Sequence, residues 1–327
     1  MKLLKFVATA IAATVLSAAT AQASEAVREL NFGMISTESS TALKSQFDPF
    51  IKDMEKALGI KVNAFMAGDY AGVIEGMRFN KVDVAWFGNK SAMEAVDRAD
   101  GEIFVQTVDV GGNPGYWSLL VTQKDSPLNT LEDVLKCDKS LTFANGDPNS
   151  TSGYLVPSYY VFAKNGVDPK ACYKTVTNAN HESNALAVAN RQVDFATFNT
   201  EAIDRLAKTH PEMSEKLKVI WKSPLIPSDP IVWRKGLPAD LKAKIKAFFL
   251  DYGVKGANAE SERKVLANLS GGWGPFRDSS DAQLTPIRQL ELFKSRAKIA
   301  GDNSLSDDNK AQKLAEIDEK LKALSAN

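Results

Sequence analysis

The sequence predicts an α/β protein built from two lobes, with the chain crossing between them twice. Short apolar segments alternate with segments whose apolar residues recur at helical spacing, which is the pattern of parallel sheets covered by helices. The alternation runs through two rounds, and a length of 327 residues suits two domains. Ligands of such sheets bind beyond the carboxyl ends of the strands.

The first round opens the first lobe. Its strands are expected at residues 30–35, 62–66, 82–87 and 103–108, and its helices at 43–58, 71–80 and 89–98. Gly59 is the typical end of a helix, and the polar turn at residues 36–41 carries the residue types that cap a helix start.

The second round forms the second lobe, after which the chain returns to the first. Strands are expected at residues 117–122, 141–144, 174–179, 193–198 and 218–222, with helices at 154–164, 184–190 and 201–208. Residues 224–230 cross back to a strand at 231–233, and the rest is mainly helical, at 239–252, 260–269, 284–299 and 308–324. We therefore place lobe 1 at residues 24–117 and 226–327, and lobe 2 at 118–225.

The first 23 residues have the features of a secretory signal peptide. Lys2 and Lys5 precede a mostly apolar stretch at residues 6–19, and small residues occupy the cleavage positions before Ser24. Cleavage after Ala23 removes two lysines and no acid, so the net charge changes from 0 to −2. This near-neutral chain has no basic stripe, which argues against nucleic acid as a partner.

Cys137 and Cys172 are the two cysteines of the chain, and each directly precedes a predicted strand. If those strands are parallel neighbours, both thiols lie at the same edge of the sheet. In an oxidising compartment this favours a disulfide, and the alternative is two free buried thiols.

The polar turn at residues 146–153 (GDPNSTSG) is the strongest candidate for a binding site. It follows an apolar strand and begins a helix, so backbone N–H groups and the helix dipole point at one spot. An ordinary helix cap needs a single hydroxyl. Ser150, Thr151 and Ser152 exceed that need, and they favour an oxyanion held without Arg or Lys.

Enzyme classes find little support in the sequence. Ser150 and His181 suggest acyl transfer, but no Gly-x-Ser-x-Gly elbow and no third triad member accompany them. There is no HExxH motif and no close His/Cys set, so we expect no metal, no cofactor and no catalysis.

Seven segments together resemble the phosphonate-binding proteins that serve bacterial ABC importers, and among these the binders of 2-aminoethylphosphonate. The similarity extends from about Leu30 to Leu292, and the matching segments are residues 30–33, 69–72, 76–81, 114–118, 146–153, 184–190 and 226–234. The resemblance implies a type II periplasmic solute-binding fold, two lobes that close on the ligand, and a membrane permease with a cytoplasmic ATPase as partners. It covers neither the two cysteines nor the last helix.

The resemblance also implies a set of ligand residues. The phosphonate oxygens would contact Ser150, Thr151, Ser152, Tyr116 and His181, and the amine of the ligand would contact Tyr70, Glu201 and Asp229. His210 receives no role.

Glu201 and Asp229 decide the kind of ligand. In a closed cleft a neutral tail would leave two carboxylates unpaired and out of water, whereas an ammonium group with three donors would satisfy them. This favours an aminoalkyl phosphonate.

Two alternative functions remain beside this prediction, and the packing of the last helix is open. The first alternative is a binder of another oxyanion, phosphate or phosphite, and the second is a periplasmic sensor subunit with the same site. The last helix carries Leu314, Ile317, Leu321 and Leu324 on one face, which predicts packing on the first lobe or on a second copy in a homo-oligomer.

Overall fold

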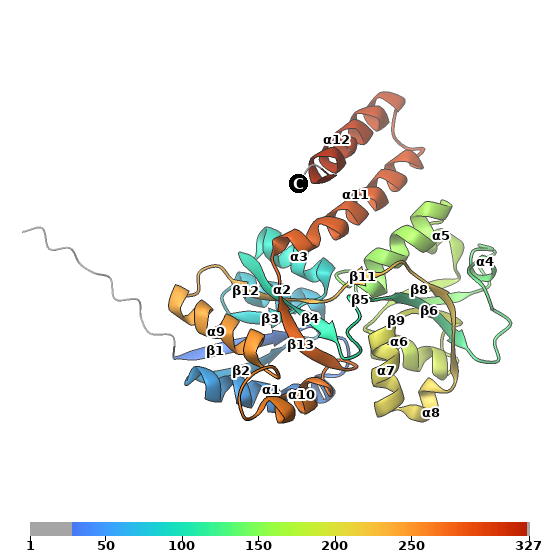
Figure 1. Ribbon diagram of the computed structural model, residues 1–327. Coiled ribbons are helices and arrows are strands. Elements are labelled where there is room, and N and C mark those ends of the chain that lie inside the picture. Colours follow the sequence, from blue (N-terminus) through green and yellow to red (C-terminus); the bar gives the residue numbers. More distant parts are fainter. Residues whose placement is uncertain (1–27, 326–327) are drawn as a thin grey trace, which may run out of the picture.

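The computed structural model describes residues 28–325, so the predicted signal peptide lies outside the described residues. Figure 1 shows two α/β lobes side by side, the first in blue, cyan and orange, the second in green and yellow. Two helices near the C-terminal end, in red, extend from the lobes as a hairpin. Within residues 28–325 no helix is long and apolar enough to cross a membrane.

A six-stranded sheet forms the centre of the first lobe. Its strands, in the spatial order β13-β4-β12-β3-β1-β2, are β1 (Glu29–Met34), β2 (Lys61–Met66), β3 (Val84–Trp86), β4 (Gly101–Asp109), β12 (Pro230–Arg234) and β13 (Trp273–Asp278). β1 runs parallel to β2 and β3, but β12 is antiparallel to β3 and β4, and β13 is antiparallel to β4. The prediction of a parallel sheet is therefore wrong for this half. The returning chain enters beside the carboxyl end of β3, so β12 has to run in the opposite direction.

The second lobe has a five-stranded sheet of the same mixed kind. In the order β10-β6-β9-β7-β8, its strands are β6 (Ser118–Gln123), β7 (Thr142–Asn145), β8 (Thr175–Asn178), β9 (Phe195–Asn199) and β10 (Leu217–Lys222). β7 is parallel to β8 and β9, whereas β6 is antiparallel to β9 and β10. The chain enters β6 from the first lobe, beside the carboxyl end of β9, so β6 runs in the opposite direction to β9, as β12 does beside β3.

The two crossings between the lobes pair with each other as a short antiparallel ribbon. It consists of β5 (Gly115–Tyr116) and β11 (Ile226–Pro227), with Tyr116 opposite Ile226. A Cβ atom at Gly115 would lie 1.9 Å from the Ile226 carbonyl oxygen, so this close approach requires glycine. The ribbon holds Tyr116 and the segment leading to Asp229 at the junction of the lobes.

Helices cover the faces of both sheets. Those of the first lobe are α1 (Ser40–Leu58), α2 (Tyr70–Arg78), α3 (Asn89–Arg98), α9 (Ala239–Asp251), α10 (Ala259–Leu266) and the short η4 (Asp281–Leu284). Those of the second are α4 (Leu131–Val134), α5 (Pro169–Cys172), α6 (His181–Ala189), α7 (Thr200–Thr209) and α8 (Pro211–Ser214). Aromatic side chains dominate both cores. Phe47 stacks on Trp86 at 5.6 Å between ring centroids, and Phe143 on Phe195 at 4.6 Å.

The helix predicted at residues 154–164 is replaced by wider turns, η1 (Thr151–Leu155) and η2 (Ser158–Phe162), followed by η3 (Ala163–Asn165). Pro157 has no N–H to offer the Gly153 carbonyl four residues earlier. That carbonyl instead accepts the Gly146 N–H at 2.9 Å, which folds the polar turn back on itself. A Cβ atom at Gly146 would lie 2.5 Å from the Gly153 carbonyl group.

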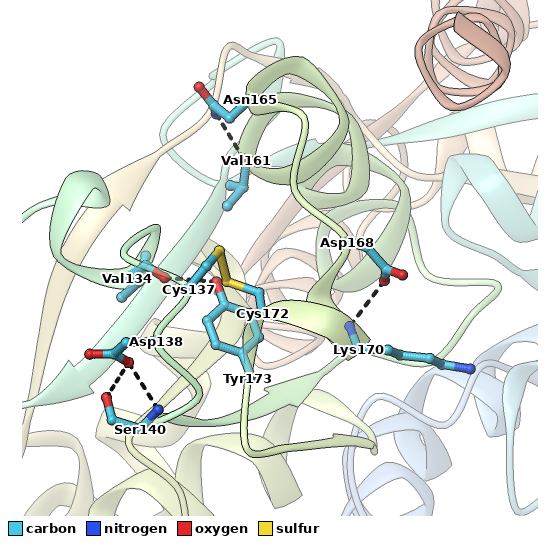
Figure 2. The surroundings of a disulfide bond; sticks show 10 residues. All are labelled: Val134, Cys137, Asp138, Ser140, Val161, Asn165, Asp168, Lys170, Cys172 and Tyr173. Atoms are coloured by element: carbon cyan, nitrogen blue, oxygen red, sulfur yellow. Dashed lines mark hydrogen bonds between the residues drawn. A yellow bond between two sulfur atoms is a disulfide. The ribbon is translucent and has the colours of Figure 1, made fainter. Parts of the chain in front are cut away.

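Cys137 and Cys172 form a disulfide in the second lobe, with an S–S distance of 2.07 Å (Figure 2). The cysteines precede β7 and β8, which are parallel neighbours, so both sulfurs lie at one edge of the sheet. Beside the disulfide the Tyr173 hydroxyl donates to the Val134 carbonyl at 2.9 Å.

The C-terminal hairpin consists of α11 (Thr285–Ala300) and α12 (Asp307–Ser325). The apolar face of α12 packs on α11, where Ile317 is buried and Arg296 pairs with Asp318 at 2.7 Å. α11 in turn contacts both lobes, through Phe293 stacked on Tyr159 and through the ion pair of Arg288 with Asp97.

Candidate functional site

A narrow cavity lies between the lobes, beyond the carboxyl ends of the parallel strands. Each of the eight predicted ligand residues lines it. The full lining comprises Ile35, Thr37, Tyr70, Trp86, Gly88, Tyr116, Ser150, Thr151, Ser152, His181, Asn199, Glu201, Arg205, Asp229 and Ser270. We call the hydroxyl groups of Ser150, Thr151 and Ser152 the hydroxyl wall and the carboxyl groups of Glu201 and Asp229 the acidic wall.

The three hydroxyls of the polar turn are buried, and each is held by an N–H group. Ser150 Oγ accepts from the Gly153 N–H at 3.0 Å within its own turn. Thr151 Oγ1 accepts from the Lys90 N–H of the first lobe at 2.8 Å. Ser152 Oγ accepts from Asn199 Nδ2 at 2.9 Å. In this closed arrangement each of the three hydroxyl oxygens therefore already accepts one hydrogen bond.

His181 is buried on the same wall and is neutral. Burial lowers the pKa of its ring to about 3, and the nearby Arg205 charge acts in the same direction. Its Nε2 atom lies 3.2 Å from Asn199 Nδ2 and 3.5 Å from Ser150 Oγ. Its Nδ1 atom is buried without a hydrogen-bond partner among the described residues.

Asn199 connects the hydroxyl wall to the acidic wall, although sequence reasoning missed it. Its Oδ1 accepts the Ala202 N–H at 2.7 Å and so caps α7, the helix that carries Glu201. This bond identifies Nδ2 as the amide nitrogen that faces Ser152 and His181. Asparagine immediately before a predicted helix was the available signal, because capping residues often lie at the mouth of such sites.

Asp229 and Glu201 form the acidic wall. Asp229 accepts from the Trp86 indole at 3.0 Å and from the Tyr116 hydroxyl at 2.9 Å. Burial raises the pKa of Asp229 to about 7, and burial together with the Asp229 charge raises the pKa of Glu201 to about 8. Both carboxyls are thus poorly stabilised as anions in the closed cavity, and a cation between them would reverse that.

Both tyrosines contact other residues of the cavity through their hydroxyls. The Tyr116 hydroxyl donates to Asp229 at 2.9 Å. The Tyr70 hydroxyl interacts with Ser150, and the charges of Asp147 and Asp229 also act on it. The ligand contacts expected for the two tyrosines stay predictions. Burial raises the pKa of both phenols, so both remain neutral donors.

Arg205 contradicts the expectation of a cleft without Arg or Lys. The side chain is buried in the cavity wall, with Nε 3.1 Å from Glu38 Oε1 and Nη1 donating to Ser270 Oγ at 2.9 Å. Arg205 comes from the second lobe and both partners come from the first. Burial raises the pKa of Glu38 and Arg205 opposes that rise, so the two groups stabilise each other as ions.

Other contacts show that the lobes are closed over the cavity. The Tyr70 N–H donates to Asp147 at 3.2 Å, the Ser39 N–H donates to Glu182 at 3.0 Å, and the Glu182 N–H donates to the Thr37 carbonyl at 3.3 Å. The Thr37 hydroxyl lines the cavity, is buried and has no partner among the described residues. Thr37 belongs to the polar turn at 36–41, but nothing in the sequence distinguished it from its neighbours.

No cluster of His, Cys, Asp or Glu that could hold a metal ion occurs within residues 28–325.

Comparison with known proteins gives one family. Residues 32–284 match the family model described as "ABC transporter, phosphonate, periplasmic substrate-binding protein". The chain is 59% identical over 301 residues to the phosphonates-binding periplasmic protein of Escherichia coli K12, covering 92% of this chain and 87% of that protein. It is 32% identical over 242 residues to a phosphate-import protein of Mycolicibacterium smegmatis, covering 71% and 74%.

A solved structure is similar over nearly the same extent. It is the binding protein component of an ABC phosphonate transporter from Pseudomonas aeruginosa, with a TM-score of 0.88 and 60% identity. The match covers 91% of this chain and 97% of that one, and the fold is the two-lobed type II architecture of periplasmic solute-binding proteins.

Proposed function

Because the chain belongs to the family of periplasmic substrate-binding proteins of phosphonate ABC transporters, we propose that its own ligand is 2-aminoethylphosphonate. As a member of that family it is a phosphonate-binding component of a transporter and not an enzyme. The lobe formed by residues 24–117 and 226–327 and the lobe formed by 118–225 close on the ligand, and the closed form is delivered to the membrane permease. The signal peptide directs export to the periplasm and is removed by cleavage after Ala23.

The phosphonate group lies against the hydroxyl wall in this proposal. Ser150, Thr151 and Ser152 each direct a hydroxyl into the cavity, and the first N–H groups of η1 add donors. Hydrogen bonds to a charged group contribute roughly 1.5–3 kcal/mol each. Tyr70, which lies beside Ser150, adds a neutral donor at this end.

The acidic wall is the single observation that carries the choice of ligand. Glu201 and Asp229 have pKa values raised to about 8 and about 7 by burial, so two carboxyls in the cavity lack a counter-charge. The Arg205 charge lowers both pKa values, but its guanidinium is paired with Glu38 and the effect of burial outweighs it. A ligand ammonium between the acids provides the charge and three donors.

The hydrogen bond from Tyr116 to Asp229 is compatible with an ammonium group at Asp229. By donating to Asp229 Oδ1 at 2.9 Å, it leaves the other carboxylate oxygen with the Trp86 indole as its donor. Each carboxylate oxygen has further lone pairs, so Asp229 can still accept from an ammonium group.

Calorimetry on mature protein tests this proposal with 2-aminoethylphosphonate, ethylphosphonate, phosphate and phosphite. We expect the aminated ligand to bind more tightly than ethylphosphonate by about 3 kcal/mol or more, roughly a hundredfold, from two charge-assisted contacts. Phosphate or phosphite binding as tightly as 2-aminoethylphosphonate would refute the proposal. It would favour the second candidate, an importer of another oxyanion, which the named function of the Mycolicibacterium relative supports.

A further inference from the structure

The three hydroxyls around the anion end of the cavity all have an oxygen that already accepts an N–H. Gly153, Lys90 and Asn199 supply those N–H groups, at 3.0, 2.8 and 2.9 Å. A hydroxyl that accepts on one side donates more strongly on the other, so each proton is available to a ligand in the cavity. The N–H groups of the first two residues of η1 have no partner within the turn and are donors as well.

The lone pair of His181 Nε2, which lies near this wall, also already accepts a hydrogen bond. Asn199 Oδ1 accepts the Ala202 N–H, so the Asn199 Nδ2 atom carries two hydrogens, one for Ser152 Oγ and one for His181 Nε2 at 3.2 Å. His181 is neutral, so its single hydrogen is on Nδ1, which has no partner in the described part of the chain. The wall therefore presents donors to the headgroup.

We infer that this donor wall favours tetrahedral headgroups that carry no proton, and that aminoalkyl and alkyl sulfonates are therefore ligands alongside phosphonates. The inference rests on the proposed function and sharpens its substrate class. A phosphonate meets the preference as its dianion, because a P–OH group gives up one oxygen lone pair that the donors of the wall would otherwise use. A sulfonate presents three bare oxygens at every pH near neutral.

Other ionisable groups also face the cavity, and the design of the test has to remove their effect. They are Glu201, Asp229, Arg205, His181, Tyr70 and Tyr116, with Glu38 and Asp147 behind them. Ethylphosphonate and ethanesulfonate share the ethyl tail, so interactions of these groups with the tail cancel when the two ligands are compared. The difference between the two ligands therefore reports the proton and the charge of the headgroup.

The test measures dissociation constants of both ligands from about pH 6 to about pH 9. Ethylphosphonate should lose affinity relative to ethanesulfonate by up to ~tenfold per pH unit below its second ionisation, since the dianionic fraction is favoured. 2-Aminoethanesulfonate should displace 2-aminoethylphosphonate. A constant phosphonate-to-sulfonate ratio across this range, or no displacement by the aminosulfonate, overturns the inference while phosphonate binding stands. Failure of both phosphonates to bind refutes the proposed function too.

A matched pair of variants gives a second readout. Asn199→Asp keeps the cap on Ala202 but places an acceptor against Ser152 Oγ, so the hydroxyl turns and offers a lone pair to the headgroup. We expect sulfonate affinity to fall at least ~tenfold more than phosphonate affinity at the acid end of the range. Asn180→Asp makes the same change at the cap of α6, where the side chain accepts from the Ser183 N–H outside the cavity lining. Its phosphonate-to-sulfonate ratio should match wild type, and identical ratios in both variants would overturn the inference.

Discussion

The buried ion pair between Glu38 and Arg205 should set the strength of lobe closure independently of the ligand. The two side chains are only 3% and 7% exposed, they come from different lobes, and they meet at 3.1 Å. Substituting Arg205→Met leaves Glu38 buried without its partner when the lobes close. Removing one member of a buried pair costs about 3–5 kcal/mol, much of it from the charge left behind.

The cost in this variant appears only on closure, because an open cleft lets water reach Glu38. Ligand affinity should therefore fall, by roughly 10²-fold or more at neutral pH, for every ligand that needs the closed form. Burial already raises the pKa of Glu38, and without Arg205 that pKa should rise further. A protonated Glu38 has no charge to bury, so affinity should recover as the pH falls.

Calorimetry with 2-aminoethylphosphonate and ethylphosphonate measures both effects. The matched control is Arg191→Met, which removes an ion pair with Asp125 whose side chains are 67% and 64% exposed. It should change affinity by less than ~1 kcal/mol, as exposed pairs contribute little. Equal losses in Arg205→Met and in Arg191→Met, or a loss confined to the aminated ligand, would show that the pair does not control closure.

Three further predictions address the acids and the disulfide. Glu201→Gln and Asp229→Asn should weaken 2-aminoethylphosphonate much more than ethylphosphonate, and equal losses in calorimetry would remove the amine assignment. The loss of affinity that Glu201→Gln causes for the aminated ligand should become smaller as the pH falls from about 8 to about 6. With a pKa of about 8, the wild-type Glu201 gains a proton in that interval and must lose it again to bind an ammonium group. Alkylation without reductant should label neither Cys137 nor Cys172 in mass spectrometry, and reduction should destabilise the second lobe by about 3–4 kcal/mol; two labelled thiols would contradict the bond.

The site was easier to predict from sequence than the strand directions. Ser150, Thr151 and Ser152 lie between a predicted strand and a predicted helix, and Glu201 begins the predicted helix that follows another strand. The carboxyl ends of those strands meet at one edge of the sheet, so the alternation of strands and helices in the sequence already predicts that these residues lie close together. β12 and β6 are antiparallel because each enters its lobe from the other, and no local pattern records the point of entry. Pro157 is visible in the sequence, and it leaves the Gly153 carbonyl without its usual donor in the helix. The local sequence does not show that the Gly146 N–H takes the place of that donor.

Arg205 and Asn199 escaped prediction for a different reason. In the sequence, Arg205 looks like an ordinary basic residue of an amphipathic helix, and Asn199 looks like an ordinary cap before that helix. Their roles come from partners distant in sequence, Glu38 for the arginine and Ser152 for the asparagine. Long-range pairs of this kind are set by how the lobes meet, which a single sequence does not encode locally.

Closure of this protein depends on two opposing electrostatic arrangements. The Glu38–Arg205 pair forms only when the lobes meet, so it favours the closed form whether or not ligand is present. Glu201 and Asp229 act in the reverse sense, because closing an empty cleft removes both carboxyls from water, as their raised pKa values indicate. If the ligand is the aminoalkyl phosphonate that we propose, its cation converts that penalty into an attraction and favours the occupied closed form over the empty one. Strengthening the ion pair alone would close the empty cleft and reduce that difference. Under the proposed function, selectivity for the amine therefore depends on the two acids having no cation between them in the empty cleft.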